Sequence, residues 1–150
     1  MTPRKQDALS VQSEAAGRQK KTFFQFTVPG APIAKARARV ITTPQGQTRS
    51  YTPDKTVFGE AKVRLYAQQA GAKMLSGPVS LHIYACFPIP KSWSEKKKES
   101  ARYATIFPQG RPDWDNIGKL VSDALNGLVW RDDGQVVKAT VEKYYGDDPM

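Results

Sequence analysis

PDWDNIGKLVSDALNGLVWRDDGQV, the sequence of residues 112–136, carries the clearest structural pattern in this chain. Its apolar side chains recur at intervals of three and four residues, which is the pattern of a helix with one buried face. These side chains are Ile117, Leu120, Val121, Ala124, Leu125 and Leu128. Asp115 stands at the start of this helix, as its N-cap or in its first turn, where the helix dipole favours an anion. Gly127 suits the end of the helix.

The residues after this helix predict a turn and then a strand. Residues 130–134 contain Asp-Asp-Gly, a common turn sequence. Residues 135–145 alternate as a strand does, with Val137, Ala139 and Val141 on one face. Helix, turn and strand therefore form one structural unit.

Two further strands are expected upstream of this unit. Residues 23–28 place Phe24, Phe26 and Val28 on one face, and prolines and a glycine follow them. Residues 79–87 alternate more regularly and give the clearest strand of the chain.

Two helices are also expected upstream. The first covers 54–70 with Asp54 as its cap, and the second is a short helix capped by Ser94. The predicted apolar stripe of the first helix consists of Val57, Ala61 and Leu65. Residues 42–53, rich in proline and glycine, predict a loop or a hairpin.

The length of 150 residues suits one domain with a tail. Residues 1–21 are polar with weak periodicity, so we interpret them as a flexible basic tail. Residues 22–150 then form a single domain.

The charge points to a polyanionic partner. Lys and Arg number 23 against 14 acidic residues, a net charge of +9. Residues 35–111 hold 14 basic and 4 acidic side chains, whereas residues 112–150 hold 4 basic and 8 acidic ones. Because an acidic cluster repels phosphate, its place beside a basic body suggests that metal ions mediate between them.

The cysteine count and hydropathy exclude several classes of protein. The single cysteine, Cys86, excludes an intrachain disulfide framework and a cysteine-based zinc site. No apolar run approaches the ~18–20 residues that span a bilayer. The sequence therefore favours a reducing, cytoplasmic location without membrane contact.

Basic residues that could contact DNA lie in two regions. In an extended chain, Lys35, Arg37 and Arg39 fall on one side, as phosphate contacts require; the alternative is a solvated edge strand. The second group of candidates consists of Lys96, Lys97, Lys98 and Arg111. The lysine triplet is equally compatible with a solvated helix face.

Carboxylates flank the helix of residues 112–136. Asp113 and Asp115 lie at its start, and Asp132 and Asp133 lie in the turn that follows. If that turn approaches the helix start, three or four carboxylates converge and would suit Mg²⁺, or Mn²⁺ in its place. Lys119 would then stabilise charge in the transition state or help to activate water.

Structural explanations of the same residues remain open. Asp113 or Asp115 could serve only as a helix cap, and Asp115 with Lys119 could form an ordinary surface ion pair. Asp-Asp-Gly could simply make a turn. Asp123 lies one turn beyond Lys119 and is, with Asp132, an additional candidate carboxylate.

The C-terminal third of the chain resembles RusA-type Holliday junction resolvases, with a close match over residues 113–143. The residues that carry the resemblance are Pro112-Asp113-Trp-Asp115-Asn116, Lys119, Asp123-Ala-Leu-Asn126-Gly127 and Asp132-Asp133-Gly-Gln135-Val136. The resemblance implies that Asp113, Asp115 and Asp133 are the essential metal-binding aspartates and that Lys119 is the catalytic lysine.

The same resemblance implies an α/β (α+β) fold, with a small mixed sheet, two main helices packed on it, and a homodimer. It also implies a Mg²⁺-dependent endonuclease that resolves Holliday junctions by paired symmetric cuts in recombination and repair, in a bacterial cell or a phage-infected host. No small-molecule cofactor besides the metal is expected.

Two other functions remain open, because charge and spacing alone indicate only a nucleic-acid enzyme. The chain could cut other branched DNA such as forks, flaps and D-loops, or it could bind DNA without cutting it. For a dimer, the expected apolar contacts come from Phe23, Phe24, Phe26 and the strand at 79–87.

Overall fold

The computed structural model describes residues 9–13 and 22–147. The strands are β1 (Leu9–Ser13), β2 (Phe23–Phe26), β3 (Arg39–Thr42), β4 (Thr48–Tyr51), β5 (Val79–Pro88) and β6 (Val136–Gly146). The helices are α1 (Asp54–Gln69), α2 (Glu95–Arg102), α3 (Trp114–Leu125) and the short 3₁₀ helix η1 (Asp133–Gln135). None of these helices is both long enough and apolar enough to cross a membrane.

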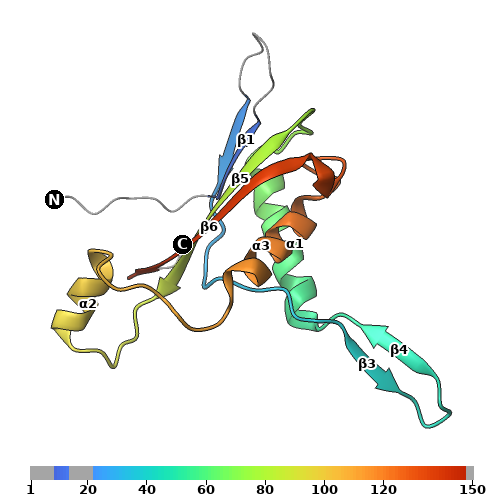
Figure 1. Cartoon of the computed structure of the whole chain (residues 1–150), viewed down its shortest axis with the longest axis horizontal. Coiled ribbons are helices and arrows are strands. Elements are labelled where there is room, and N and C mark those ends of the chain that lie inside the picture. Colours follow the sequence, from blue (N-terminus) through green and yellow to red (C-terminus); the bar gives the residue numbers. More distant parts are fainter. Residues whose placement is uncertain (1–8, 14–21, 148–150) are drawn as a thin grey trace.

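The main sheet has four strands in the order β2-β1-β5-β6 (Figure 1). The pairs β2–β1 and β1–β5 are antiparallel, while β5 and β6 are parallel. The sheet is therefore mixed, and the expected α/β fold class is confirmed.

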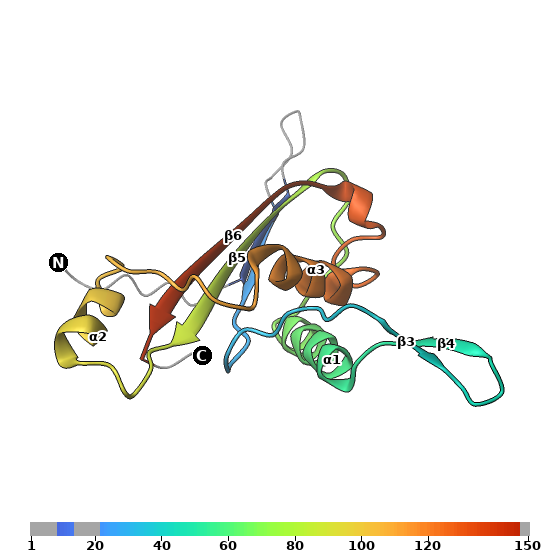
Figure 2. The same cartoon turned by 60° about the horizontal axis from the view of Figure 1, so that its bottom comes forward.

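Both long helices lie on one face of this sheet, as Figure 2 shows. The buried core joins Leu81 and Ile83 of β5 to Leu120 and Leu125 of α3. Trp130, fully buried, closes the core just after α3. The apolar side chains that recur in residues 112–136 thus form the buried face of α3, as their spacing predicted. The opposite face of α3 is free to carry polar side chains.

The first strand corrects the predicted domain boundary. Leu9–Ser13, assigned to the tail, form β1 and lie between β2 and β5. The apolar and polar residues of LSVQS do alternate, but five residues in a polar surrounding give a weak strand signal. The interpretation of residues 9–13 as tail is therefore wrong, and the rest of 1–21 lies outside the described residues.

The buried side of α1 also differs from the predicted stripe. The buried residues are Thr56, Gly59, Val63 and Ala67. The predicted stripe of Val57, Ala61 and Leu65 is exposed instead. At Gly59 an added Cβ would lie 2.8 Å from Ile33 and 3.0 Å from Leu120. Because α1 approaches these neighbours so closely, small side chains fit on its buried side better than bulky ones. Asp54 lies in the first turn, and Pro53 takes the cap position.

A β-bulge explains a third difference. Val79 pairs with Val136, but Ser80 pairs with Lys138, so Val137 is the extra residue of β6. Val137 is 67% exposed, whereas Val141 packs against the core. The predicted common face of Val137, Ala139 and Val141 is therefore wrong at Val137.

Two parts of the fold extend from opposite ends of the molecule (Figures 1 and 2). One is the β3–β4 hairpin, which settles the choice between loop and hairpin for residues 42–53. The other is α2, whose N-cap Ser94 accepts a hydrogen bond from the Lys97 amide as predicted.

Candidate active site

A chain of alternating charges links α1, α3 and the turn at η1. Lys119 Nζ lies 2.9 Å from Asp123 Oδ1 and 3.8 Å from Asp133 Oδ2. The other oxygen of Asp123 accepts a hydrogen bond from Lys35, whose Nζ also lies 3.2 Å from Glu60 Oε1. Three carboxylates and two ammonium groups therefore meet, with a formal charge of −1. We call these five residues the charge chain.

Asp123 is the centre of the charge chain and its side chain is only 18% exposed. Burial alone would raise its pKa, but hydrogen bonds from Lys35 and Lys119 outweigh burial and hold the pKa of Asp123 below its usual value. The hydrogen bond to Asp123 likewise raises the pKa of Lys119 against a smaller effect of burial. Lys119 therefore stays protonated at neutral pH, which suits charge stabilisation better than proton abstraction.

Asp133 is held in a fixed orientation beside α3. Its Oδ1 accepts hydrogen bonds from Ser122 Oγ at 3.1 Å and from Trp130 Nε1 at 3.2 Å. The neighbouring Asp132 turns the other way and accepts from the Gly134 amide at 3.2 Å as the cap of η1. Of the two adjacent aspartates, only Asp133 faces Lys119.

Asp113 and Asp115 lie at the start of α3. Asp113 takes the N-cap position, but its side chain makes no cap hydrogen bond, and Asp115 is in the first turn. Both side chains are exposed. Lys119 pairs with Asp123 in the next turn rather than with Asp115, so the alternative of an Asp115–Lys119 surface pair is not present among the described residues.

The three aspartates named by the resemblance do not converge. Asp133 lies beside Ser122, and seven residues of helix separate Ser122 from Asp115, which is about 10 Å along the axis. Within residues 9–13 and 22–147, no group of three His, Cys, Asp or Glu side chains could hold a metal ion. Carboxylate oxygens have the right chemistry for Mg²⁺, but this spacing does not fit a three-carboxylate site.

The structure places the candidate DNA contacts in four different surroundings. Lys35 belongs to the charge chain, whereas Arg37 and Arg39 are exposed on the way into the hairpin. Arg111 is exposed just before α3. The lysine triplet lies on α2: Lys97 stacks on Trp93 at 4.0 Å and Lys98 pairs with Glu95 at 3.2 Å. Residues 96–98 are thus at the opposite end of the molecule from the hairpin (Figure 1).

Sequence reasoning missed three partners of this site. Glu60, Ser122 and Trp130 each bind one of the charged groups described above. Ser122 and Trp130 stand within eleven residues of Asp133, but no spacing rule joins Glu60 to Lys35, since that contact depends on how α1 packs against α3.

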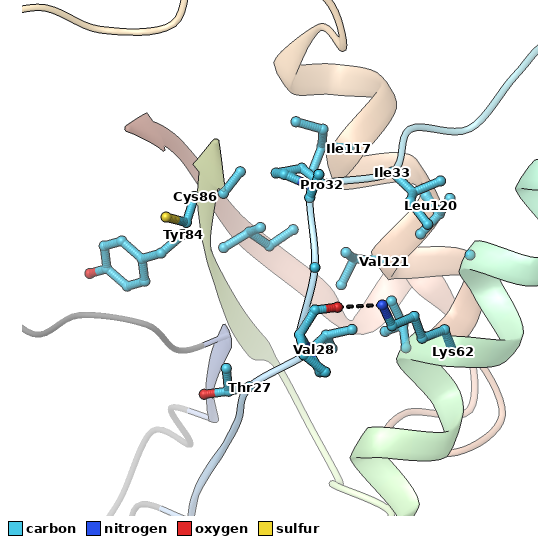
Figure 3. Close-up of a pocket in the computed structure, with 17 residues that line it drawn as sticks. Thr27, Val28, Pro32, Ile33, Lys62, Tyr84, Cys86, Ile117, Leu120 and Val121 are labelled. Carbon is cyan, nitrogen blue, oxygen red and sulfur yellow. Dashed lines mark hydrogen bonds between the residues drawn. The ribbon is translucent and has the colours of Figure 1, made fainter. Parts of the chain in front are cut away.

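A separate cavity lies under residues 27–33, between β5, α1 and α3 (Figure 3). Val28, Ile33, Leu120 and Val121 line it with apolar side chains, and Lys62 donates a hydrogen bond to the Pro29 carbonyl at its edge. Its lining contains no aspartate or glutamate, so it offers no carboxylate ligand for Mg²⁺.

Comparisons with known proteins identify the family of the chain. The family model described as endodeoxyribonuclease RusA matches residues 29–150. The uncharacterized protein YqaN of Bacillus subtilis (strain 168) is 39% identical over 129 residues, which cover 84% of this chain and 90% of that protein. No solved structure matches. The chain therefore belongs to the RusA family of endodeoxyribonucleases.

Proposed function

We propose that this chain is a Mg²⁺-dependent endonuclease that resolves four-way DNA junctions. The observation that carries the proposal is the position of Lys119, exposed on α3 between Asp123 and Asp133 and one turn from Asp115. Because the chain belongs to an endodeoxyribonuclease family, we expect the phosphodiester to react beside these side chains.

The side chains divide into two roles. Lys119, kept charged by Asp123, stabilises the negative charge that develops on the phosphate. Asp113, Asp115 and Asp133 supply the carboxylates on which activity depends. Because the three carboxylates do not converge among the described residues, a divalent cation would be held by fewer than three of them. It would supply positive charge to the phosphate and to the attacking water, and Mn²⁺ has the same ligand preference as Mg²⁺.

We further propose that the enzyme is a homodimer. Productive resolution of a four-way junction needs two opposed cuts, and each chain offers one set of these residues, so a two-fold dimer would match the substrate. Phe26 is buried and β5 lies inside the sheet, which argues against them as contacts. Exposed Val57, Phe58 and Leu65 on the outer face of α1 are better suited.

Light scattering tests the dimer. We expect about twice the 16.7 kDa of one chain at micromolar concentration, and Phe58→Asp should shift the protein towards the monomer. A wild-type monomer that nicks a cruciform one strand at a time would contradict both the dimer and paired cutting.

The function is tested by incubating the protein with a four-way junction and a matched linear duplex, each with and without Mg²⁺. We expect paired cuts in the junction only, and only with the metal. Equal cutting of flaps or forks would favour a nuclease for other branched DNA. Binding that is unaffected by EDTA, with no cutting under any condition, would identify a non-catalytic DNA-binding protein.

A further inference from the structure

The β3–β4 hairpin has one basic face and one neutral face. Directly opposed residues of antiparallel strands point to the same side of the ribbon. Arg39 is opposite Tyr51, and Ile41 is opposite Arg49, so these four side chains share a face. The other face carries Val40, Thr42, Thr48 and Ser50. Arg49, which sequence reasoning did not single out, therefore doubles the positive charge of the face that contains Arg39.

Residues 9–13 and 22–147 place no covering layer over this ribbon. Every residue of β3 and β4 is exposed, including Ile41 at 49% and Tyr51 at 42%. Among the described residues the side chains of Arg39 and Arg49 have no hydrogen bond or ion pair, whereas Lys35 has two carboxylate partners. An isolated two-stranded hairpin is only marginally stable, so a partner that covers this face would stabilise it.

The charge of the segment selects the partner. Residues 35–53 contain four basic side chains and no acidic one. A second copy of this chain that covered this face with its own ribbon would bring like charges together, which is unfavourable. A phosphodiester backbone supplies the complementary charge, and Ile41 and Tyr51 supply apolar area for sugars and base edges.

The geometry of the ribbon fits duplex DNA beside the proposed active site. A two-stranded ribbon is of a size that the major groove admits. From Arg39 to Gln45 at the tip, six residues extend at most about 20 Å, because Pro44 and Gln45 lie in the turn. This is at most about six base pairs. The base of the ribbon is fixed, because the Lys35 amide donates to the Asn116 carbonyl of α3 and the Ala36 amide donates to Thr56 Oγ1.

We propose that the β3–β4 hairpin lies in a groove of one duplex arm, next to the scissile phosphate. Arg39 and Arg49 bind phosphates, and Ile41 and Tyr51 contact the groove edge. The proposal rests on the proposed function, because it takes the DNA cut at α3 as the ligand. It adds a contact that begins beside the site and continues along an arm for at most about six base pairs of ribbon length.

The first test measures binding in EDTA, where no cutting is expected. Arg39→Gln combined with Arg49→Gln should weaken junction binding and lower the slope of log K against log salt by about two. The control combines Lys73→Gln with Lys138→Gln, which removes the same charge from exposed sites outside the hairpin and should leave the slope close to that of the wild type. An Arg39/Arg49 variant that has the wild-type slope overturns the proposal.

The second test locates the hairpin tip. A photocrosslinker attached at Gln45→Cys, in a Cys86→Ala background, should react with nucleotides of one duplex arm, several base pairs from the cut. Crosslinking only at the branch point, or only to a second protein chain, overturns the proposal. Thermal unfolding checks that each variant is folded. If the Arg39/Arg49 variant is not folded, the crosslinking experiment decides whether the hairpin contacts DNA, because that protein keeps both arginines.

The outcomes separate this proposal from the proposed function. A wild-type protein that binds junctions and never cuts them would refute the proposed function. The salt slope of the Arg39/Arg49 variant and the crosslink from residue 45 would still test the hairpin contact. If the protein cuts junctions, but the Arg39/Arg49 variant keeps the wild-type salt slope and residue 45 does not crosslink to a duplex arm, only the hairpin contact is refuted. Loss of the dimer in the Arg39/Arg49 variant, with DNA affinity unchanged, would assign the ribbon to a second copy and overturn the proposal.

Discussion

Replacing Asp123 by Asn tests the charge chain at its centre. The substitution keeps the shape of the side chain but removes the charge that both Lys35 and Lys119 bind. A hydrogen bond between charged groups contributes about 1.5–3 kcal/mol when partly buried. The bond to Lys119 contributes less, about 0.2–1 kcal/mol, because the Lys119 side chain is 57% exposed. We expect Asp123→Asn to lower the free energy of unfolding by about 2 kcal/mol.

Urea unfolding at pH 7 measures this change, which corresponds to a fall in Tm of roughly 4–8 °C for a chain of this size. Asp132→Asn is the matched control, since its carboxylate only caps η1 and Asn caps about as well as Asp, so the free energy of unfolding should change by less than about 0.5 kcal/mol. In a Lys35→Met background the effect of Asp123→Asn should shrink, because one of the two bonds is already absent. A change for Asp123→Asn within 0.5 kcal/mol of zero, roughly the scatter of neutral surface substitutions, would refute the reasoning.

The sign of the pH dependence follows from the lowered pKa of Asp123. Above the pKa of the unfolded chain, near 3.8, the carboxylate is charged in both states and its contribution is complete. As the pH falls below that value the unfolded chain binds the proton first, so the contribution declines and is lost as the pH passes the folded pKa. The difference between wild type and Asp123→Asn should therefore narrow at acid pH.

Three further predictions concern the site and the core. Asn at Asp113, Asp115 or Asp133 should abolish junction cutting while a gel-shift assay shows nearly wild-type binding; normal cutting by any one of the three variants would remove that residue from the site. Lys119→Ala should lower the single-turnover rate by about 10²–10³-fold and affinity far less; a loss confined to affinity would assign it to backbone contact. Gly59→Ala should cost about 1–3 kcal/mol in thermal unfolding, because the new Cβ would lie 2.8 Å from an isoleucine methyl; an unchanged Tm would contradict that packing.

Strong periodicity made the central elements predictable. The apolar positions of residues 112–136 gave the buried face of α3, and the alternation of residues 79–87 gave β5 to within one residue. In α1 the same method selected Val57 and Leu65, because hydropathy favours large apolar groups. The helix instead buries Gly59 and other small side chains where it approaches its neighbours, and no periodicity rule weighs closeness of packing.

The site was predictable in its residues more than in its arrangement. The aspartates and Lys119 lie on α3 and its flanking turn, as the spacing indicated. Their expected convergence is absent among the described residues, because Asp133 lies beside the third turn of α3 and not beside its first. Which of two adjacent aspartates faces the helix depends on the dihedral angles of the turn, and the role of Asp123 depends on a lysine 88 residues away.

The place of β1 in the sheet bears on how the chain can be shortened. Cutting the chain to the region that matches the family, residues 29–150, would remove β1 and β2 together. The ten-residue strand β5, with Val79, Leu81 and Ile83 in its core face, would then become an open edge. Unprotected edges of that length recruit strands from other molecules. A shortened chain would therefore precipitate for reasons unrelated to its active site, and inactivity of such a fragment would say nothing about Asp113 or Lys119.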